Sequence, residues 1–177
     1  MVEIGRLQES DIGTIPAVGG DAVHGKESFW RTLLEEPVDD RLILVARDSS
    51  AVVGYVFLKW RSKYRPFADA DVPEISDLRV APGMQRRGIA TALIAQCEQL
   101  ARERRHETIG IGVGLYGDYG PAQRLYFKLG YGPDGRGTTF GAVPVTPGEM
   151  VRMDDDLVLW LTKDLSQSEP AAAASPA

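Results

Sequence analysis

The chain has 177 residues, of which 44% are hydrophobic, and a formal net charge of −5 at pH 7. This length fits one globular domain that buries its own core, and the acidic balance disfavours a nucleic-acid binder, whose affinity comes largely from cations facing phosphates. No apolar run is long enough to span a membrane, no export signal is visible, and a single cysteine excludes an internal disulfide. We therefore expect a cytoplasmic protein with a domain at residues 1–165 and a disordered tail at 166–177.

The first third of the chain predicts a strand, two short helices and a hairpin. Pro16 and the pair Gly19-Gly20 interrupt the helical pattern, so the helical region divides in two, with Phe29, Trp30 and Leu33 facing inward. Two β-branched runs separated by a polar turn then predict antiparallel strands. The expected elements are strands at 2–7, 41–47 and 52–60, helices between 13 and 36, and a loop at 63–70.

Along the next predicted strand, 72–80, the apolar residues change from odd to even positions. Ile75 places odd positions on the apolar face, whereas Leu78 and Val80 place even positions there. A β-bulge near Ser76-Asp77 reconciles the two registers, and bulges often lie beside active sites. The alternative is a strand edge without strict facing.

The turn after this strand has the composition of an anion site. Its residues are Gln85, Arg86, Arg87, Gly88, Ile89, Ala90 and Thr91. A helix that begins here has unpaired N–H groups and a partial positive charge at its start, which favour a bound phosphate. Gly88 lacks the Cβ that would keep a phosphate from the backbone. The alternative is an ordinary strand-to-helix turn with exposed arginines.

The following helix and strand place apolar residues on one face each. The helix buries Cys97, and a thiol in an apolar setting is usually inert, so no nucleophile is assigned to it. Strand 108–115 carries Gly110, Gly112 and Gly114 on its other face, which indicates that a packed helix or a ligand comes close to that face.

The remainder predicts a short helix and two strands. Gly120-Pro121 begins the helix and Gly130 ends it. A weak strand near 138–143 and a buried strand at 157–165 complete a mixed sheet of seven strands with helices on its faces.

Two motifs in this element order resemble those of the GNAT N-acetyltransferase superfamily. The family's acyl-CoA motif, Gln/Arg-x-x-Gly-x-Gly/Ala, is matched at Gln85, Gly88 and Ala90. A second match runs over the segment Ala122-x-x-Leu125-Tyr126-x-x-x-Gly130-Tyr131. One position departs from the family: Tyr119 stands where an asparagine is common.

The resemblance covers residues 2–165 and implies the GNAT fold of the α/β (α+β) class. That fold has a mixed, mostly antiparallel seven-stranded sheet with a bulged, splayed fourth strand and helices on both faces. It also implies acetyl-CoA as cosubstrate, with its pyrophosphate on the amides of Arg86 to Thr91. The pantetheine would pair with Leu78, Arg79 and Val80 like an extra strand, and Tyr119 would replace the asparagine that contacts it.

The resemblance implies direct acetyl transfer to an amine in a ternary complex. An alkyl amine has a pKa of ~10.4, so a base must take its proton at pH 7. Glu74 and Asp77 are the candidate bases, with solvated carboxylates as the alternative. The N–H of Val80 would stabilise the oxyanion. Tyr126 is the candidate acid for the CoA thiolate, with a core tyrosine as the alternative.

The acceptor is expected to be an amine of a small molecule or a peptide. The acidic residues Glu149 and Asp154-Asp155-Asp156 attract a cationic amine or simply form a solvated loop. His24 and His106 lack partners at metal-ligand spacing, so no metal is expected. Neither a nucleic acid nor a membrane is expected as a partner, and a homodimer stays open.

Two other functional classes compete with the enzyme. A non-catalytic acyl-CoA-binding sensor or regulatory module would keep the same fold. Nucleotide binding at the arginine turn is disfavoured, because the chain has no glycine-rich loop of the Walker type with its lysine.

Overall fold

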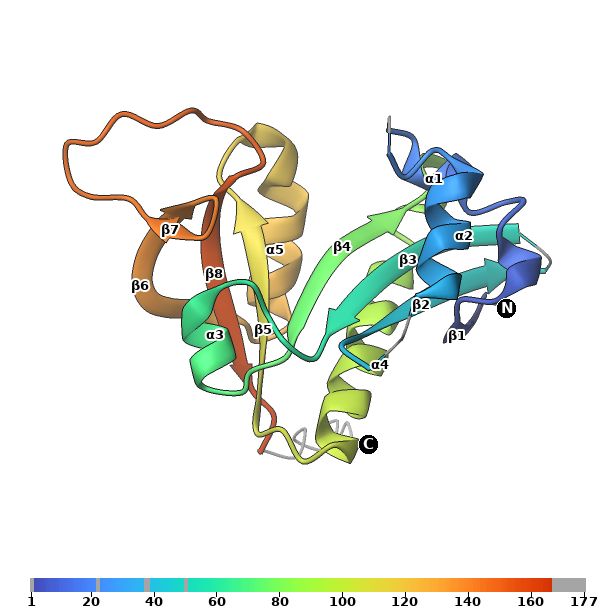
Figure 1. Ribbon diagram of the computed structural model, residues 1–177, viewed down its shortest axis with the longest axis horizontal. Helices are drawn as coiled ribbons and strands as arrows, with labels where there is room; N and C mark the ends of the chain where they lie inside the picture. The colour runs from blue at the N-terminus through green and yellow to red at the C-terminus, as the bar shows by residue number, and fades with distance from the viewer. Residues whose placement is uncertain (1, 22, 37–38, 50, 167–177) are drawn as a thin grey trace, which may run out of the picture.

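The computed structural model describes residues 2–21, 23–36, 39–49 and 51–166, and its strands form a sheet in the order β1-β2-β3-β4-β5-β8-β6-β7 (Figure 1). Only β4 and β5 pair in parallel; the other neighbours are antiparallel. The strands are β1 (Val2–Arg6), β2 (Arg41–Asp48), β3 (Ala51–Lys59), β4 (Glu74–Val80), β5 (Thr108–Gly114), β6 (Gly132–Phe140), β7 (Val143–Pro144) and β8 (Leu157–Asp164).

Five α-helices and three 3-10 turns are described. The helices are α1 (Pro16–Gly19), α2 (Glu27–Glu35), α3 (Arg65–Asp69), α4 (Ile89–Glu103) and α5 (Gly120–Lys128). The turns are η1 (Glu9–Asp11), η2 (Pro82–Met84) and η3 (Gly117–Tyr119). No helix among the described residues combines the length and the apolar character that a membrane crossing requires.

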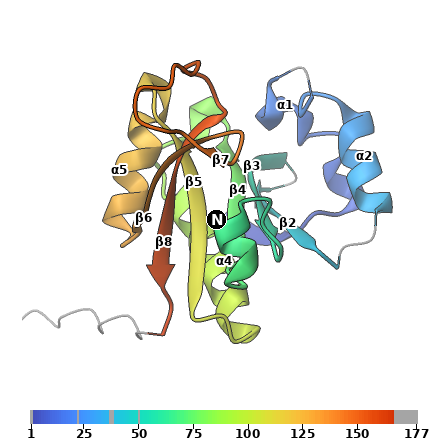
Figure 2. The same cartoon turned by 60° about the vertical axis from the view of Figure 1, so that its left-hand side comes forward.

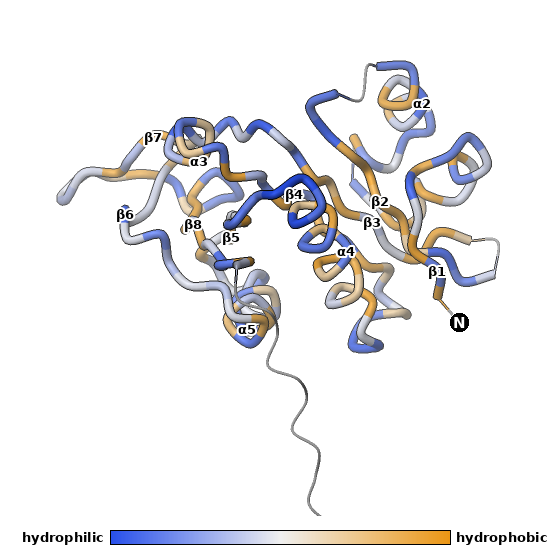
Figure 3. Tube along the Cα trace, turned by 90° about the horizontal axis from the view of Figure 1, so that it is seen from below, coloured by the Kyte–Doolittle hydropathy of each residue, from blue (hydrophilic) through white to orange (hydrophobic). Residues whose placement is uncertain are grey.

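Both faces of the sheet are covered by helices. On one face, Leu93 and Cys97 of α4 pack with Ile111 of β5 in a core that also holds Tyr126 of α5. On the opposite face, Trp30 of α2 packs in a second core with residues of α1, β2 and β3. Figure 2 shows α1 and α2 apart from α5, on the other side of the central strands. The hydropathy colouring shows β2 mostly in orange, as expected for a strand whose central residues are buried (Figure 3).

The expected fold class is confirmed, with differences in detail. The mixed, mostly antiparallel sheet has eight strands rather than seven, because residues 143–144 form the short edge strand β7 beside β6. The loop expected at 63–70 was wrong, since it contains α3, whose Phe67 packs with Tyr64 and Trp160. Five residues with a proline at the start are too few to show helical periodicity. The predicted tail lies outside the described residues, apart from Ser166.

Candidate active site

The strands β4 and β5 separate after two residue pairs and leave an opening in the sheet. They pair only at Glu74 with Gly110 and at Ile75 with Ile111, and then diverge in a V (Figure 1). A cavity of about 250 Å³ lies at this opening, with walls from β4, β5, β8, η3 and α5. The residues around it include Asp77, Leu78, Arg79, Tyr119, Tyr126 and Asp155. The predicted splay of the fourth strand is therefore confirmed.

A β-bulge in β4 causes the separation. Tyr55 of β3 pairs with Arg79, and Phe57 pairs with Ser76, so two residues of β4 face one residue of β3. Asp77, one of these two, has a φ of +51°, in the left-handed region. Aspartate tolerates this region better than most side chains, because its short polar group can hydrogen-bond locally. The sequence placed the bulge at the right residue.

Beyond the bulge, the backbone of Val80 faces the opening. Gly54 and Val80 are opposed across β3 and β4, and the N–H of Ala81 donates to the carbonyl of Val53 at 2.9 Å. This pattern identifies Gly54 and Val80 as a non-hydrogen-bonded pair, so the N–H and C=O of Val80 point away from β3. The carbonyl accepts a hydrogen bond from Gln85 Nε2 at 3.3 Å, and the N–H faces the side where β5 has moved away.

The turn after β4 presents bare amides at the start of α4. Gly88, with a φ of +80°, is the N-cap residue, and no side chain caps this helix end. Arg86 also has a positive φ, of +59°, and both it and Arg87 are exposed. The uncapped N–H groups of a 15-residue helix and two adjacent guanidinium groups suit an anion such as a pyrophosphate.

Glu74 lies on the cavity wall, but both of its oxygens have partners. It is 5% exposed, Ser62 Oγ donates to its Oε2 at 2.5 Å, and Lys59 Nζ lies 3.4 Å from its Oε1. These contacts reduce its freedom to take a proton from a substrate. Asp77, by contrast, is partly exposed beside the cavity and accepts a hydrogen bond from Ser76 Oγ at 3.1 Å.

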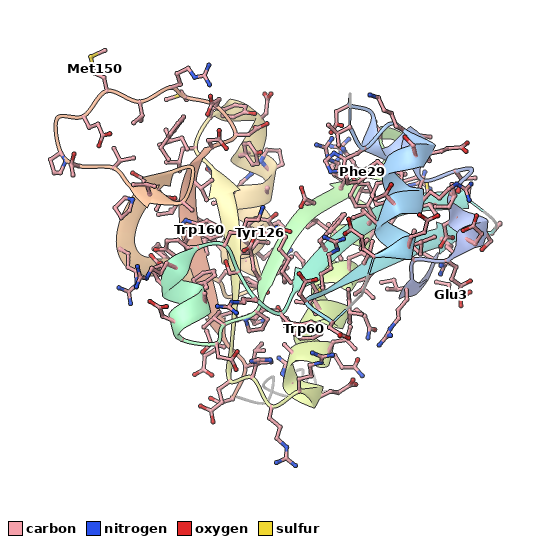
Figure 4. The ribbon with its side chains drawn as sticks, viewed as in Figure 1. Glu3, Phe29, Trp60, Tyr126, Met150 and Trp160 are labelled. Atoms are coloured by element: carbon pink, nitrogen blue, oxygen red, sulfur yellow. The ribbon has the colours of Figure 1, made fainter. Side chains whose placement is uncertain are left out.

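Two tyrosines face the cavity from the side of β5. Burial raises the pKa of Tyr126 to about 12, so its phenol is protonated throughout the neutral range. Burial, and then the hydrogen bond to Asp155, also raise the pKa of Tyr119, whose hydroxyl donates to Asp155 Oδ1 at 3.0 Å. Tyr116 donates to the same oxygen. Figure 4 shows Tyr126 and Trp160 on the β5 and β8 side of the opening and Phe29 on the opposite side.

The glycine face of β5 is covered by aromatic rings of the protein itself. A Cβ on Gly110 would lie 2.1 Å from the ring of Phe67, and one on Gly114 would lie 2.4 Å from the ring of Tyr119. At Gly112 a Cβ would lie 3.1 Å from the ring of Trp160. The sequence left a helix or a ligand as the neighbour of this face. The observed neighbours are three aromatic rings, one of them from α3, and the side chain of Val158, while Gly112 and Gly114 also line the cavity.

Sequence reasoning missed a polar cluster on the other side of the opening, in the turn between α1 and α2. Asp21 Oδ2 accepts a hydrogen bond from His24 Nδ1 at 2.8 Å and lies 2.8 Å from Arg79 Nη2. Burial raises the pKa of Asp21, but hydrogen bonds from the side chain of His24 and from the backbone of His24 and Val23 outweigh it and lower the pKa to about 2. The only sequence signal was the Asp-x-x-His spacing after a glycine pair.

The structure places six of the fourteen predicted site residues around one cavity. Glu74, Asp77, Leu78, Arg79, Tyr119 and Tyr126 line it. Gln85 to Thr91 do not line it and lie instead just past the end of β4, at the start of α4. Among the described residues, no group of three or more His, Cys, Asp or Glu side chains is arranged to hold a metal ion.

Solved structures with the same architecture include several acetyltransferases. The N-acetyltransferase of Staphylococcus aureus Mu50 has 17% identity and a TM-score of 0.69, with 93% of this chain and 99% of that chain covered. The ribosomal-protein-alanine N-acetyltransferase of Brucella melitensis has 23% identity, a TM-score of 0.65, and coverage of 92% and 99%. The ribosomal-protein-S18-alanine N-acetyltransferase of Escherichia coli has 16% identity, a TM-score of 0.65, and coverage of 97% and 99%. At these identities the likeness shows a shared fold.

The family is identified by comparing the sequence with family profiles. No curated protein matches the chain. The profile described as "Acetyltransferase (GNAT) family" matches residues 12–131, which is more than half of the sequence and includes both the anion turn and Tyr126. The chain therefore belongs to the GNAT family of acetyltransferases.

Proposed function

We propose that this protein is an N-acetyltransferase that moves an acetyl group from acetyl-CoA to a primary amine by direct attack in a ternary complex. The observation that carries the proposal is the opening between β4 and β5, where a cavity lies, together with the uncapped start of α4 that follows β4 in the chain. Membership of the GNAT family supports acyl transfer from an acyl-CoA to an amine. The single cysteine, Cys97, is buried and has no second cysteine with which to form an internal disulfide, which suits a reducing compartment such as the cytoplasm.

The residues around the opening fit acetyl-CoA. The amides from Arg86 to Thr91 and the guanidinium groups of Arg86 and Arg87 would hold the pyrophosphate. The backbone from Leu78 to Val80, on the edge of β4 that β5 has left, would pair with the amides of the pantetheine, as an added strand does. Bound there, acetyl-CoA would supply an activated acyl carbon.

The cavity offers groups for each demand of the reaction. The N–H of Val80 points away from β3, toward the side that β5 has left, and would stabilise a developing oxyanion. Tyr126 would donate a proton or a hydrogen bond to the departing thiolate, and its raised pKa favours hydrogen bonding over complete transfer. Of the two candidate carboxylates, Asp77 is better placed than Glu74, because Lys59 and Ser62 engage the oxygens of Glu74.

The charges around the cavity favour a cationic acceptor. Three acidic residues, Glu74, Asp77 and Asp155, line it together with one basic residue, Arg79, whose guanidinium group is paired with Asp21. Opposite charge concentrates a protonated amine at such a site. Since the solved relatives share only the fold with this chain, the acceptor must be found by experiment.

The test is an incubation of the protein with acetyl-CoA and a panel of polyamines, aminoglycosides, amino acids and peptides. We expect free thiol to appear with at least one amine and not without an amine. Binding of CoA with no thiol release across the panel would favour an acyl-CoA sensor, for which the engaged oxygens of Glu74 are the supporting observation. Absence of CoA binding would contradict both functions.

A further inference from the structure

His24, which the sequence left without a role, lies beside the β4 bulge. Its Nε2 atom is 4.0 Å from Asp77 Oδ1. Its side chain is 17% exposed, and its ring lies near that of Tyr55, with the centroids 6.1 Å apart and the planes at 27°. The histidine therefore reaches from the turn between α1 and α2 to a residue that lines the cavity.

Three residues fix the position of His24, two of them by direct hydrogen bonds. Asp21 accepts hydrogen bonds from the Nδ1 and the backbone N–H of His24, at 2.8 and 2.7 Å. Arg79 holds Asp21 in turn and also donates to the carbonyl of Gly19 at 2.8 Å. Trp30 Nε1 donates to the carbonyl of His24 at 2.7 Å. This number of contacts gives the ring a defined orientation before any substrate arrives.

The orientation determines which ring nitrogen is free. An ionised carboxylate only accepts hydrogen bonds, so Nδ1 carries a hydrogen toward Asp21. In the neutral ring, Nε2 is then the lone-pair nitrogen, and it faces Asp77. A base whose second nitrogen is oriented by a carboxylate is the arrangement that proton abstraction requires.

A third polar group next to the ring has no partner. The Tyr55 hydroxyl is fully buried and makes no hydrogen bond within the described part of the chain. Burial raises the pKa of Tyr55; Arg79 lowers it, and the charges of Asp77 and Asp21 raise it further, so the phenol lies within reach of all three charges. The groups facing His24 are thus Asp21 from its own turn, Asp77 and Arg79 from β4, and Tyr55 from β3; its neighbours in α2, Phe29 and Trp30, carry no charge.

We propose that His24 Nε2 and Asp77 Oδ1 together bind the amino group of the acceptor and that His24 takes a proton from it. Two atoms 4.0 Å apart can both hydrogen-bond one nitrogen at the usual distance of ~2.9 Å. Asp77 contributes the negative charge that holds an ammonium ion, and an imidazole is a stronger base than a carboxylate. This inference rests on the proposed acetyl transfer and assigns its proton acceptor.

The protons and electrons of this step balance. The ammonium group loses one proton to His24 Nε2, and the freed lone pair forms the C–N bond with the acyl carbon. The C–S bond breaks, and its electron pair leaves on sulfur. A second proton leaves the nitrogen as the amide forms, and one proton is taken up by the thiolate, to which Tyr126 donates a hydrogen bond. His24 then releases its proton to solvent.

The experiment uses the full chain with substitutions at both of its histidines. His24→Asn keeps an amide near the position of Nδ1 and so retains the bond to Asp21, whereas His24→Gln places a non-basic amide near Nε2. His106→Gln is the matched control, because His106 stacks on Trp60 and bonds to the carbonyl of Asp71, away from the cavity. Each variant is assayed for CoA binding, for thermal unfolding, and for kcat as a function of pH with the best acceptor.

We expect both His24 variants to bind CoA normally and to lose at least ~100-fold in kcat, the contribution of a typical general base. We expect the rate of the wild type and of His106→Gln to fall at acid pH, and this fall should be absent from the His24 variants. In a further variant, His24→Ala, free imidazole should restore part of the rate. Turnover within tenfold of the wild type in either folded His24 variant, with an unchanged pH profile, would overturn the inference alone. Wild-type protein that acetylates no amine would overturn the proposed function as well. If one His24 variant unfolds, the other variant and the imidazole rescue still test whether His24 takes the proton.

Discussion

At the scale of single residues, the structure distinguishes the two carboxylates that the sequence offered as candidate bases. Glu74 belongs to a buried cluster with Lys59 and Ser62, whereas Asp77 is held at the bulge with a positive φ and faces His24. The sequence places both carboxylates on one strand, three residues apart. Their neighbours come from other elements, and those neighbours decide which carboxylate is free to act.

Glu74→Gln should therefore affect stability more than catalysis. The amide retains a partner for Ser62 but removes the charge opposite Lys59, so we expect a loss of about 1–3 kcal/mol in the free energy of unfolding, measured in urea. The shape of the pH–rate profile should not change. A shifted profile in a variant of normal stability would restore Glu74 as the base.

Tyr126→Phe tests the proposed acid. We expect kcat to fall more than tenfold with CoA binding intact, because the hydroxyl next to the departing thiolate is lost. Tyr64→Phe is the control, since Tyr64 is equally buried but donates to Asp134 rather than facing the cavity. A loss below tenfold in a normally folded Tyr126→Phe protein would exclude an important role for this phenol.

The pKa of Tyr126 adds a test of stability against pH. Burial raises this pKa to about 12, above the usual ~10, so the stability gained by keeping the phenol neutral is complete below pH 10 and is lost as the pH rises toward 12. Unfolding measured from pH 9 to 12 should show the wild type losing stability relative to Tyr126→Phe over that interval. Parallel curves would mean that the phenol is not buried.

His24 shows the limit of sequence reasoning at this scale. Its partners Asp77, Arg79 and Tyr55 lie on strands far from it in sequence, and no local pattern brings them together. Tyr126 and the bulge could be predicted, because a motif or a phase break within a few residues marked each of them.

At the scale of elements, periodic segments were predictable and short ones were not. The strands β2 to β5 and helix α4 follow apolar periodicity that the sequence displays openly. The five residues of α3 and the two of β7 have no such period, and they exist because Phe67 packs on Tyr64 and Trp160 and because residues 143–144 pair with β6. Tertiary contacts, rather than local preference, create these two elements.

The start of α4 gives the prediction at this scale. Gly88→Ala should cost about 1 kcal/mol of stability, because a Cβ is strained at a φ of +80°, and should weaken CoA binding at least tenfold by displacing the helix amides from the phosphates. Gly83→Ala is the matched control: a Cβ there also meets no atom within 4 Å, but its φ is not positive. The CoA affinities of the two variants are compared by titration calorimetry. Equal affinities would mean that the pyrophosphate does not bind at the start of α4.

At the scale of the whole molecule, two halves of one sheet meet at only two residue pairs between β4 and β5. A pantetheine paired with Leu78 to Val80 would lie in the gap between these halves. Since a ligand that binds only the folded state stabilises it, CoA at about 100 times its Kd should add about 2.7 kcal/mol. For a chain of this size the melting temperature should rise by about 5–10 °C. No rise at saturating CoA would argue against a site in the gap.

The most direct test of acetyl transfer at the β4–β5 opening follows the acetyl group itself. The full-length protein is incubated with acetyl-CoA and each amine of the panel, and free thiol and acetylated amine are measured together by absorbance and mass spectrometry. We predict one acetylated amine for each thiol released with at least one cationic acceptor, and a rate that falls in Gly88→Ala but not in Gly83→Ala. Thiol release without an acetylated amine, or no release with any amine, would contradict the proposed N-acetyltransferase.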